Sequence, residues 1–101
     1  MKKQLIRTPA YLADLDDIEF YIAEDNPQAG RDVWHYINDH VMNLTDSNFP
    51  RRPGRVEGTM ELVAQESYIV VLIEGAHSVT VLNVIGPRQN WPKTGRVKKR
   101  K

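Results

Sequence analysis

Three short apolar runs rich in β-branched residues restrict the folds open to the second half of the chain. They cover residues 59–64, 68–74 and 79–85, and polar turns at 65–67 and 75–77 separate them. Runs of this length with short turns between them predict strands. The middle run is apolar on both faces, as expected for a central strand that is covered on each side. A small antiparallel sheet is therefore predicted for this half.

The first half of the chain carries two helix starts with a physical basis. Thr8 and Asn26 each precede a proline, so their side chains can accept hydrogen bonds from free first-turn N–H groups. A proline needs no donor at that position, and its φ is already helical. Helices are predicted over about 9–24 and from 27 to about 44, with almost no loop between them, which folds them into an αα-hairpin. Gln4–Arg7 is predicted to be a short edge strand.

Apolar residues recur along both predicted helices at spacings of three and four, which places them on one face of each helix. These residues are Tyr11, Leu15, Ile18, Ile22, Val33, Ile37, Val41 and Leu44. Trp34 is expected beside this stripe, and Asp14, Asp16, Asp17 and Glu19 are expected on the solvated side of the first helix. The predicted order is β-α-α-β-β-β, an α+β fold with the hairpin packed on the small antiparallel sheet.

Charge is divided between the two halves of the chain. Residues 1–50 carry four basic and nine acidic side chains, a balance of −5, whereas residues 51–101 carry ten and four, a balance of +6. Such a division predicts an acidic face and a basic face, and an anionic partner that is nucleic acid or an acidic protein segment. Residues 93–101 are predicted to form a basic, flexible tail.

Size and composition exclude several classes of protein. A chain of 101 residues is expected to form one domain, 1–101, and the absence of cysteine excludes disulfides and thiol chemistry. No apolar run approaches the roughly 20 residues of a membrane span. Neither a phosphate-binding glycine loop nor a zinc-protease motif is present, and His35 and His40 are five residues apart on different helix faces. We expect a soluble cytoplasmic protein with no metal, cofactor or membrane partner.

Three segments carry a resemblance to a known family. They are Gly58-Thr59-Met60-Glu61-Leu62-Val63, Tyr68-Ile69-Val70 and Arg88-Gln89-Asn90-Trp91-Pro92. In this order they closely resemble the Gly-Thr-Arg-Glu-Leu-Val, Tyr-Ile-Val and Arg-Gln-x-Trp-Pro segments of the RelE/ParE superfamily of bacterial toxins. The resemblance covers nearly the whole chain. It implies the same compact fold, and a type II toxin that a cognate ParD-like or RelB-like antitoxin neutralises.

The superfamily contains two mechanisms, and the resemblance favours one of them. RelE-like members cleave mRNA inside the ribosome, with cations and a proton-transfer group around the scissile phosphate. ParE-like members bind DNA gyrase without cleaving a substrate. The ribonuclease members usually carry an arginine directly after the strand aromatic, where this chain has Ile69. The sequence therefore favours a ParE-like gyrase inhibitor over an enzyme, and a ribosome-dependent mRNA interferase or an attenuated relative that only binds antitoxin remain alternatives.

The resemblance and the predicted hairpin assign two sets of binding residues. The predicted target-binding residues are Met60, Arg55, Arg88, Gln89 and Trp91, and the predicted antitoxin-binding residues are Tyr11, Leu15, Ile18 and Trp34. Two positions depart from the family pattern, since Met60 replaces an arginine and Gly86 replaces a frequent histidine. An arginine restored at Met60 is expected to raise toxicity if the side chain lies on the basic rim, and to unfold the protein if it lies in the core.

Overall fold

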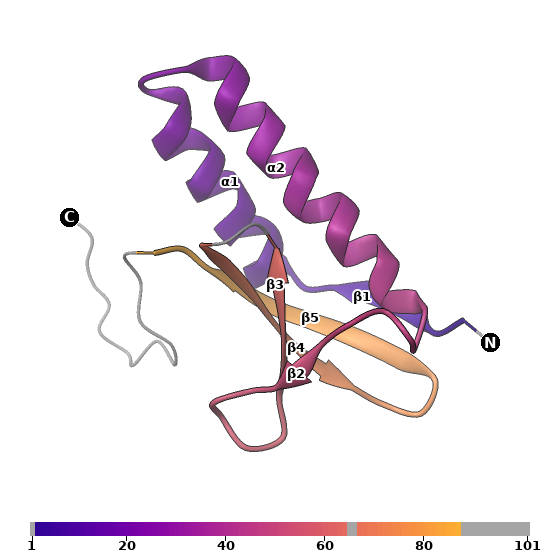
Figure 1. Cartoon of the computed structure of the whole chain (residues 1–101). Coiled ribbons are helices and arrows are strands. Elements are labelled where there is room, and N and C mark those ends of the chain that lie inside the picture. Colours follow the sequence, from indigo (N-terminus) through magenta and orange to yellow (C-terminus); the bar gives the residue numbers. More distant parts are fainter. Residues whose placement is uncertain (1, 65–66, 88–101) are drawn as a thin grey trace.

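In the computed structural model, which describes residues 2–64 and 67–87, two helices lie across one face of a five-stranded sheet (Figure 1). The helices are α1 (Pro9–Ala23) and α2 (Pro27–Met42), and a short 3-10 helix, η1 (Asn43–Thr45), follows α2. The strands are β1 (Gln4–Arg7), β2 (Arg52–Pro53), β3 (Met60–Ala64), β4 (Tyr68–Glu74) and β5 (Ser78–Ile85). The predicted α+β fold, with a helical hairpin on a sheet, is confirmed.

The strands are arranged in the order β1-β5-β4-β3-β2, with β4 antiparallel to both of its neighbours as predicted. However, β1 runs parallel to β5 and places Leu5 beside Val79, so the sheet is mixed. The antiparallel sheet predicted for the second half of the chain is thus extended at this edge by a parallel pair, whose direction was not predicted. The parallel pairing follows from the route of the chain, because the helices and three strands lie between β1 and β5 and form a long crossover. The two-residue strand β2, at the other edge, was not predicted.

Both helices begin where the capping residues predict. The Thr8 hydroxyl accepts a hydrogen bond from the Tyr11 N–H at 3.2 Å, and the Asn26 side-chain oxygen accepts one from the Ala29 N–H at 3.1 Å. Each cap satisfies one of the N–H groups that have no partner inside a helix, and each is followed by a proline. Helix α1 ends at Ala23, one residue before the predicted end, and β4 has the predicted bounds.

The main core lies between the helical hairpin and the sheet. Burial raises the pKa of the Tyr11 hydroxyl, which stays protonated and donates to Asn38 Oδ1 at 3.0 Å. Most of the two predicted apolar stripes is buried here, together with the residues of the sheet that face the helices. The buried residues of this core are Tyr11, Leu15, Ile18, Ile37, Val41, Leu44, Leu62, Ala64, Val70, Leu72, Val79, Val81 and Val84.

Asp14 corrects the predicted division of α1 into an apolar and a solvated face. Its side chain is 7% exposed, and its Oδ2 accepts hydrogen bonds from the Val84 N–H and the Asn83 side-chain amide, both at 3.0 Å. The pairing of β4 with β5 is irregular between Val71 and Leu72, next to this contact. Because a bulge disrupts the ladder locally, a carboxylate on the facing helix can bond to a strand amide. Asp14 thus attaches α1 to the irregular part of β5.

Candidate functional site

The face of the sheet that points away from the helices is apolar along β3 and β4. Successive side chains of a strand point to opposite faces, so Val63, Ile69, Val71 and Ile73 lie opposite the residues of the core. Val63 and Ile73 are 42% and 45% exposed, Ile69 is half-buried, and Val71 is buried. We call these four residues the outer sheet face. The central strand was predicted to be covered on each side, but the helices cover only one side of it (Figure 1).

Glu61 organises the cationic rim of the outer sheet face. Its side chain, 2% exposed, accepts hydrogen bonds at Oε1 from Arg52 Nη2 at 3.1 Å and at Oε2 from Arg55 Nε at 3.0 Å. The Arg55 backbone N–H also donates to Oε2 at 3.1 Å. Burial alone would raise the pKa of Glu61, but the hydrogen bonds from Arg55 and Arg52 outweigh it and hold the pKa below its usual range. The two arginines remain about half exposed beside this ionised carboxylate.

Arg51, in contrast, belongs to the interior of the fold. Its side chain is 5% exposed and donates to Glu74 Oε2 at 3.0 Å and to the Phe49 carbonyl at 2.9 Å. Lys3 Nζ lies 2.8 Å from the same Glu74 oxygen. The Lys3 hydrogen bond and the nearby Arg51 charge hold the pKa of Glu74 below its usual range, although partial burial opposes them. This cluster links the N-terminal strand and the loop after η1 to the end of β4.

A cavity of about 360 Å³ lies between α2 and the edge of β3. His40 of α2, residues 49–52 of the loop and residues 61–63 of β3 line it. The ring of His40 lies 5.9 Å from the ring of Phe49 and 4.6 Å from the ring of Tyr36, measured between ring centroids. We call this cavity and the adjoining edge of β3 the α2–β3 groove. No pattern in the sequence indicated it, because its walls come from three separate segments.

The protein-family model described as "ParE toxin of type II toxin-antitoxin system, parDE" matches residues 5–91. The chain belongs to this toxin family. The resemblance to the RelE/ParE superfamily that the sequence motifs indicate is thereby confirmed. A curated relative, "Putative toxin Y4kP" of Sinorhizobium fredii (strain NBRC 101917 / NGR234), is 32% identical over 91 residues, which cover 90% of this chain and 95% of the relative.

Two solved structures of toxin–antitoxin systems share the fold. The chromosomal ParDE system from P. aeruginosa matches with a TM-score of 0.72 and 22% identity, over 82% of this chain and 94% of that chain. The toxin–antitoxin complex RelBE2 from Mycobacterium tuberculosis matches with a TM-score of 0.55 and 16% identity, over 85% and 99% of the two chains. At these identities the likeness establishes the shared fold of the ParE and RelE types.

The predicted target-binding residues are not gathered on one exposed surface of the described chain. Met60 is half-buried and packs against the core, on the face of β3 that also carries Leu62. Arg55 lies on the opposite face of the sheet, bonded to Glu61. The other three predicted residues, and the predicted flexible tail at 93–101, lie outside the described residues. These three are Arg88, Gln89 and Trp91.

The predicted antitoxin-binding residues are mostly core residues. Tyr11 and Leu15 have no exposed surface and Ile18 is 9% exposed, so in this fold they offer little surface to a partner, and their contact with an antitoxin stays a prediction. The sheet covers the part of the helical stripe to which these residues belong. Trp34 is half-buried between the helices, and its indole N–H donates to Asp16 Oδ1 at 3.0 Å.

None of the helices in the described part of the chain is long and apolar enough to cross a membrane.

Proposed function

We propose that this ParE-family chain acts by binding a protein target, DNA gyrase, through the outer sheet face. The observation that carries this proposal is that the outer sheet face is apolar in its centre and bounded by arginines. Interfaces with proteins combine an apolar centre with polar rims and are enriched in arginine. Interfaces with nucleic acid are much more polar and positively charged. Ile69 lies on this face, at the position where the ribonuclease members usually carry an arginine.

The described arginines beside this face are also arranged differently from cations that bind a phosphate. Arg52 and Arg55 share one ionised carboxylate, Glu61, so the local positive charge is reduced from two to one. A group that stabilises the developing charge of a cleaved phosphate has to be directed at the substrate. The Arg52 and Arg55 guanidinium groups instead already donate to Glu61. This pairing supports protein recognition rather than mRNA cleavage.

We further propose that a cognate antitoxin neutralises the chain in the cytoplasm. The family is described by its place in a type II toxin–antitoxin system, and the two solved structures that share the fold come from such systems. Val63 and Ile73 of the outer sheet face are 42% and 45% exposed, and exposed apolar side chains of this kind favour a partner that covers them. A small protein encoded beside the gene for this chain, if one is found there, is the first candidate to test as the antitoxin.

The direct test assays purified protein for gyrase inhibition and for mRNA cleavage on programmed ribosomes. We expect loss of supercoiling activity and no new codon-positioned stops in primer extension. Ile73→Glu should weaken gyrase inhibition at least about tenfold, since it puts a charge on an exposed apolar part of the proposed interface. Phe20→Glu is the matched control, because Phe20 is an apolar residue that is 71% exposed and belongs to α1 rather than to the sheet.

The outcomes of this test separate the alternatives. Ribosome-dependent cuts without gyrase inhibition would overturn the proposal in favour of the ribonuclease mechanism. An inactive wild-type protein that still forms a complex with its antitoxin would identify an attenuated relative. Equal inhibition by the Ile73 and Phe20 variants, both folded, would show that gyrase binds elsewhere on the toxin.

A further inference from the structure

Strand β5 carries an extra residue near its middle. The neighbours Val71 and Leu72 of β4 lie opposite Asn83 and Val81 of β5, so Leu82 has no residue opposite it. An inserted residue of this kind is a β-bulge, which bends its strand and interrupts the regular pairing. Bulges are frequent beside functional sites, where they redirect side chains. The last residues of β5 therefore point to faces that a regular strand would not give them.

The bulge decides which residues of β5 face the helices. Val81 and Val84 both belong to the core, although they are three residues apart. Side chains of a regular strand alternate between two faces, so residues three apart would lie on opposite faces. With the extra residue both valines reach the core, and Ile85 lies on the other face, opposite Ile69 of β4. Ile85 is 3% exposed and lies beside Ile69, which belongs to the outer sheet face.

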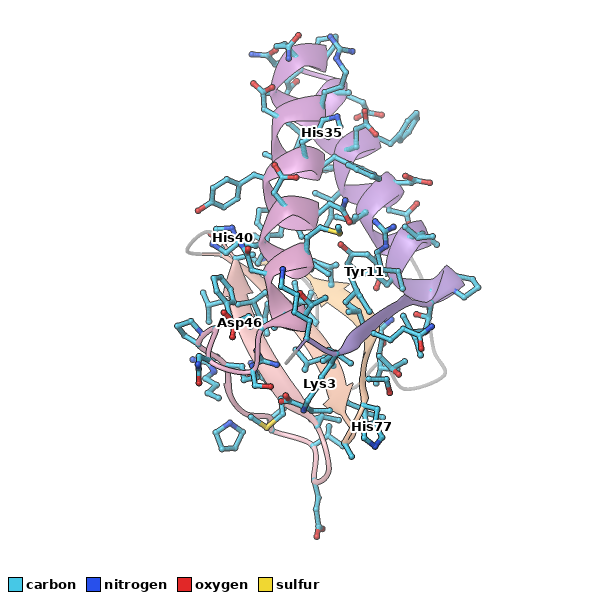
Figure 2. The ribbon with its side chains drawn as sticks, turned by 90° about the vertical axis from the view of Figure 1, so that its right-hand side faces the viewer. Lys3, Tyr11, His35, His40, Asp46 and His77 are labelled. Atoms are coloured by element: carbon cyan, nitrogen blue, oxygen red, sulfur yellow. The ribbon has the colours of Figure 1, made fainter. Side chains whose placement is uncertain are left out.

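Helix α1 and its capping residue hold β5 on both sides of the bulge. Before the bulge, the Val81 carbonyl oxygen accepts hydrogen bonds from the Thr8 N–H at 3.2 Å and from the Thr8 hydroxyl at 2.8 Å. After the bulge, the Asp14 carboxylate accepts a hydrogen bond from the Val84 N–H at 3.0 Å. Tyr11, between these two residues in sequence, is buried near the start of α1, close to the sheet (Figure 2). The first turns of α1 are thus attached to β5 at both ends of the bulge.

The Val84 N–H bonds to a helix because β1 does not reach it. β1 ends at Arg7, opposite Val81, and within residues 2–64 and 67–87 no strand continues beside residues 82–85 on that side of β5. A buried backbone N–H without a partner is strongly unfavourable, and a carboxylate is a strong acceptor for it. Asp14 therefore takes the place of a neighbouring strand and favours the register that has Val84 in the core.

We propose that Asp14 is a positioning residue for target binding: by holding β5 after its bulge, it places Ile85 beside Ile69 and so shapes the outer sheet face. A slip of one residue would exchange the two faces at the end of β5 and turn Ile85 toward the helices. The segment 88–91, which carries predicted target-binding residues, follows soon after Ile85 in sequence, so the same register decides where it begins. This inference rests on the proposed function in that it takes the outer sheet face as the target surface.

Nuclear Overhauser effects between the side chains of Ile69 and Ile85 in the purified full chain report this register. We expect them in the wild type and expect Asp14→Leu to lose them, because leucine cannot accept a hydrogen bond from β5. Asp16→Leu is the matched control, since it makes the same change on α1 at a carboxylate that bonds to α2 instead. A folded Asp14→Leu variant that keeps these contacts overturns the inference. Where leucine prevents folding, Asp14→Ser replaces it with the same outcomes, because water can then reach the strand amide.

Supercoiling assays with the same variants test whether the register matters for target binding. At a temperature where circular dichroism shows the proteins folded, Asp14→Leu should weaken gyrase inhibition at least about tenfold, whereas Asp16→Leu should stay within about twofold of wild type. Asp14→Asn keeps an oxygen acceptor and should inhibit within about threefold of wild type. A contribution to stability alone would not separate variants that are all folded.

The outcomes distinguish this inference from the proposed function. Equal inhibition by the folded Asp14→Leu and Asp16→Leu variants would overturn the positioning role, as would an Asp14→Asn variant as weak as Asp14→Leu. A wild-type protein that does not inhibit gyrase would contradict the proposed function, and the contacts between Ile69 and Ile85 would still decide whether Asp14 sets the register.

Discussion

Replacing Glu61 by glutamine removes the charge that holds two arginines at the edge of the sheet. The carboxylate is 2% exposed and accepts hydrogen bonds from the Arg52 side chain and from the side chain and backbone N–H of Arg55. Glutamine has nearly the same shape but is neutral, and its amide group would face an arginine donor. Glu61→Gln therefore tests the electrostatic contribution of this cluster with little change in packing.

The expected loss is about 2 kcal/mol of unfolding free energy. A net hydrogen bond to a charged group contributes about 1.5–3 kcal/mol, and breaking a fully buried pair costs about 3–5 kcal/mol. The smaller of these two values applies, because Arg52 and Arg55 are 54% and 46% exposed and can turn toward water when the carboxylate is lost. In a domain of this size such a loss lowers the melting temperature by about 8–16 °C.

The stabilisation that Glu61 provides should depend on pH, and the lowered pKa of Glu61 predicts the direction. The folded-state pKa of Glu61 is lowered, so its ionised form is favoured in the folded protein. The stabilisation is therefore fully present above the unfolded pKa of about 4.3 and is lost as the pH falls through the lower folded value. The difference in stability between wild type and Glu61→Gln should be constant near neutral pH and should shrink below about pH 4.

Thermal melts followed by circular dichroism at pH 7 and at acid pH measure both effects. Glu57→Gln is the matched control, because Glu57 is exposed in the same loop and no described hydrogen bond or ion pair involves it. It should leave the melting temperature nearly unchanged. Equal melting temperatures for the Glu61 and Glu57 variants at pH 7 would refute the reasoning, as would a Glu61 effect that persists undiminished at acid pH.

Three further substitutions probe the core and the helix contact. Met60→Arg should lower stability by about 1–3 kcal/mol in a thermal melt rather than raise toxicity, because Met60 packs against the core. Gly30→Ala should cost about 1–3 kcal/mol in urea unfolding, since the new Cβ would lie 2.7 Å from the Glu19 carbonyl oxygen and the helices would have to separate. Tyr11→Phe removes the donor to Asn38 and should cost about 1 kcal/mol by the same measurement.

The elements that could be predicted from the sequence are those fixed by local chemistry. The two capping residues with their prolines determine where the helices begin, and the apolar runs determine where the three long strands lie. The short edge strand Gln4–Arg7 was also located from its own residues. Its parallel pairing was not, because that depends on how the chain returns to it after six intervening elements. Local patterns contain no information about that route.

Side chains that act across the fold were harder to predict than the elements that carry them. Asp14 was predicted on the solvated side of α1, yet its carboxylate accepts a hydrogen bond from the Val84 N–H of β5. Glu61 is part of a family motif, but its role as a shared acceptor appears only when the loop folds back beside β3. A separate ion pair with Glu74 removes Arg51 from the predicted basic surface. The role of each of these three side chains depends on its partner. That partner is either distant in sequence or brought close by the fold of a loop.

These pairings change the meaning of the division of charge along the chain. The excess of basic residues in the second half predicts a basic face for an anionic partner, but Arg51 and Lys3 bind Glu74, and Arg52 and Arg55 share one carboxylate. Among the described residues, Arg51, Arg52 and Arg55 therefore hold their segment against the sheet, and this pairing reduces the charge that they can present to a partner. The surface they frame is apolar, so the specificity of this toxin should depend on shape and buried contact area, with the arginines selecting the acidic residues at its edge.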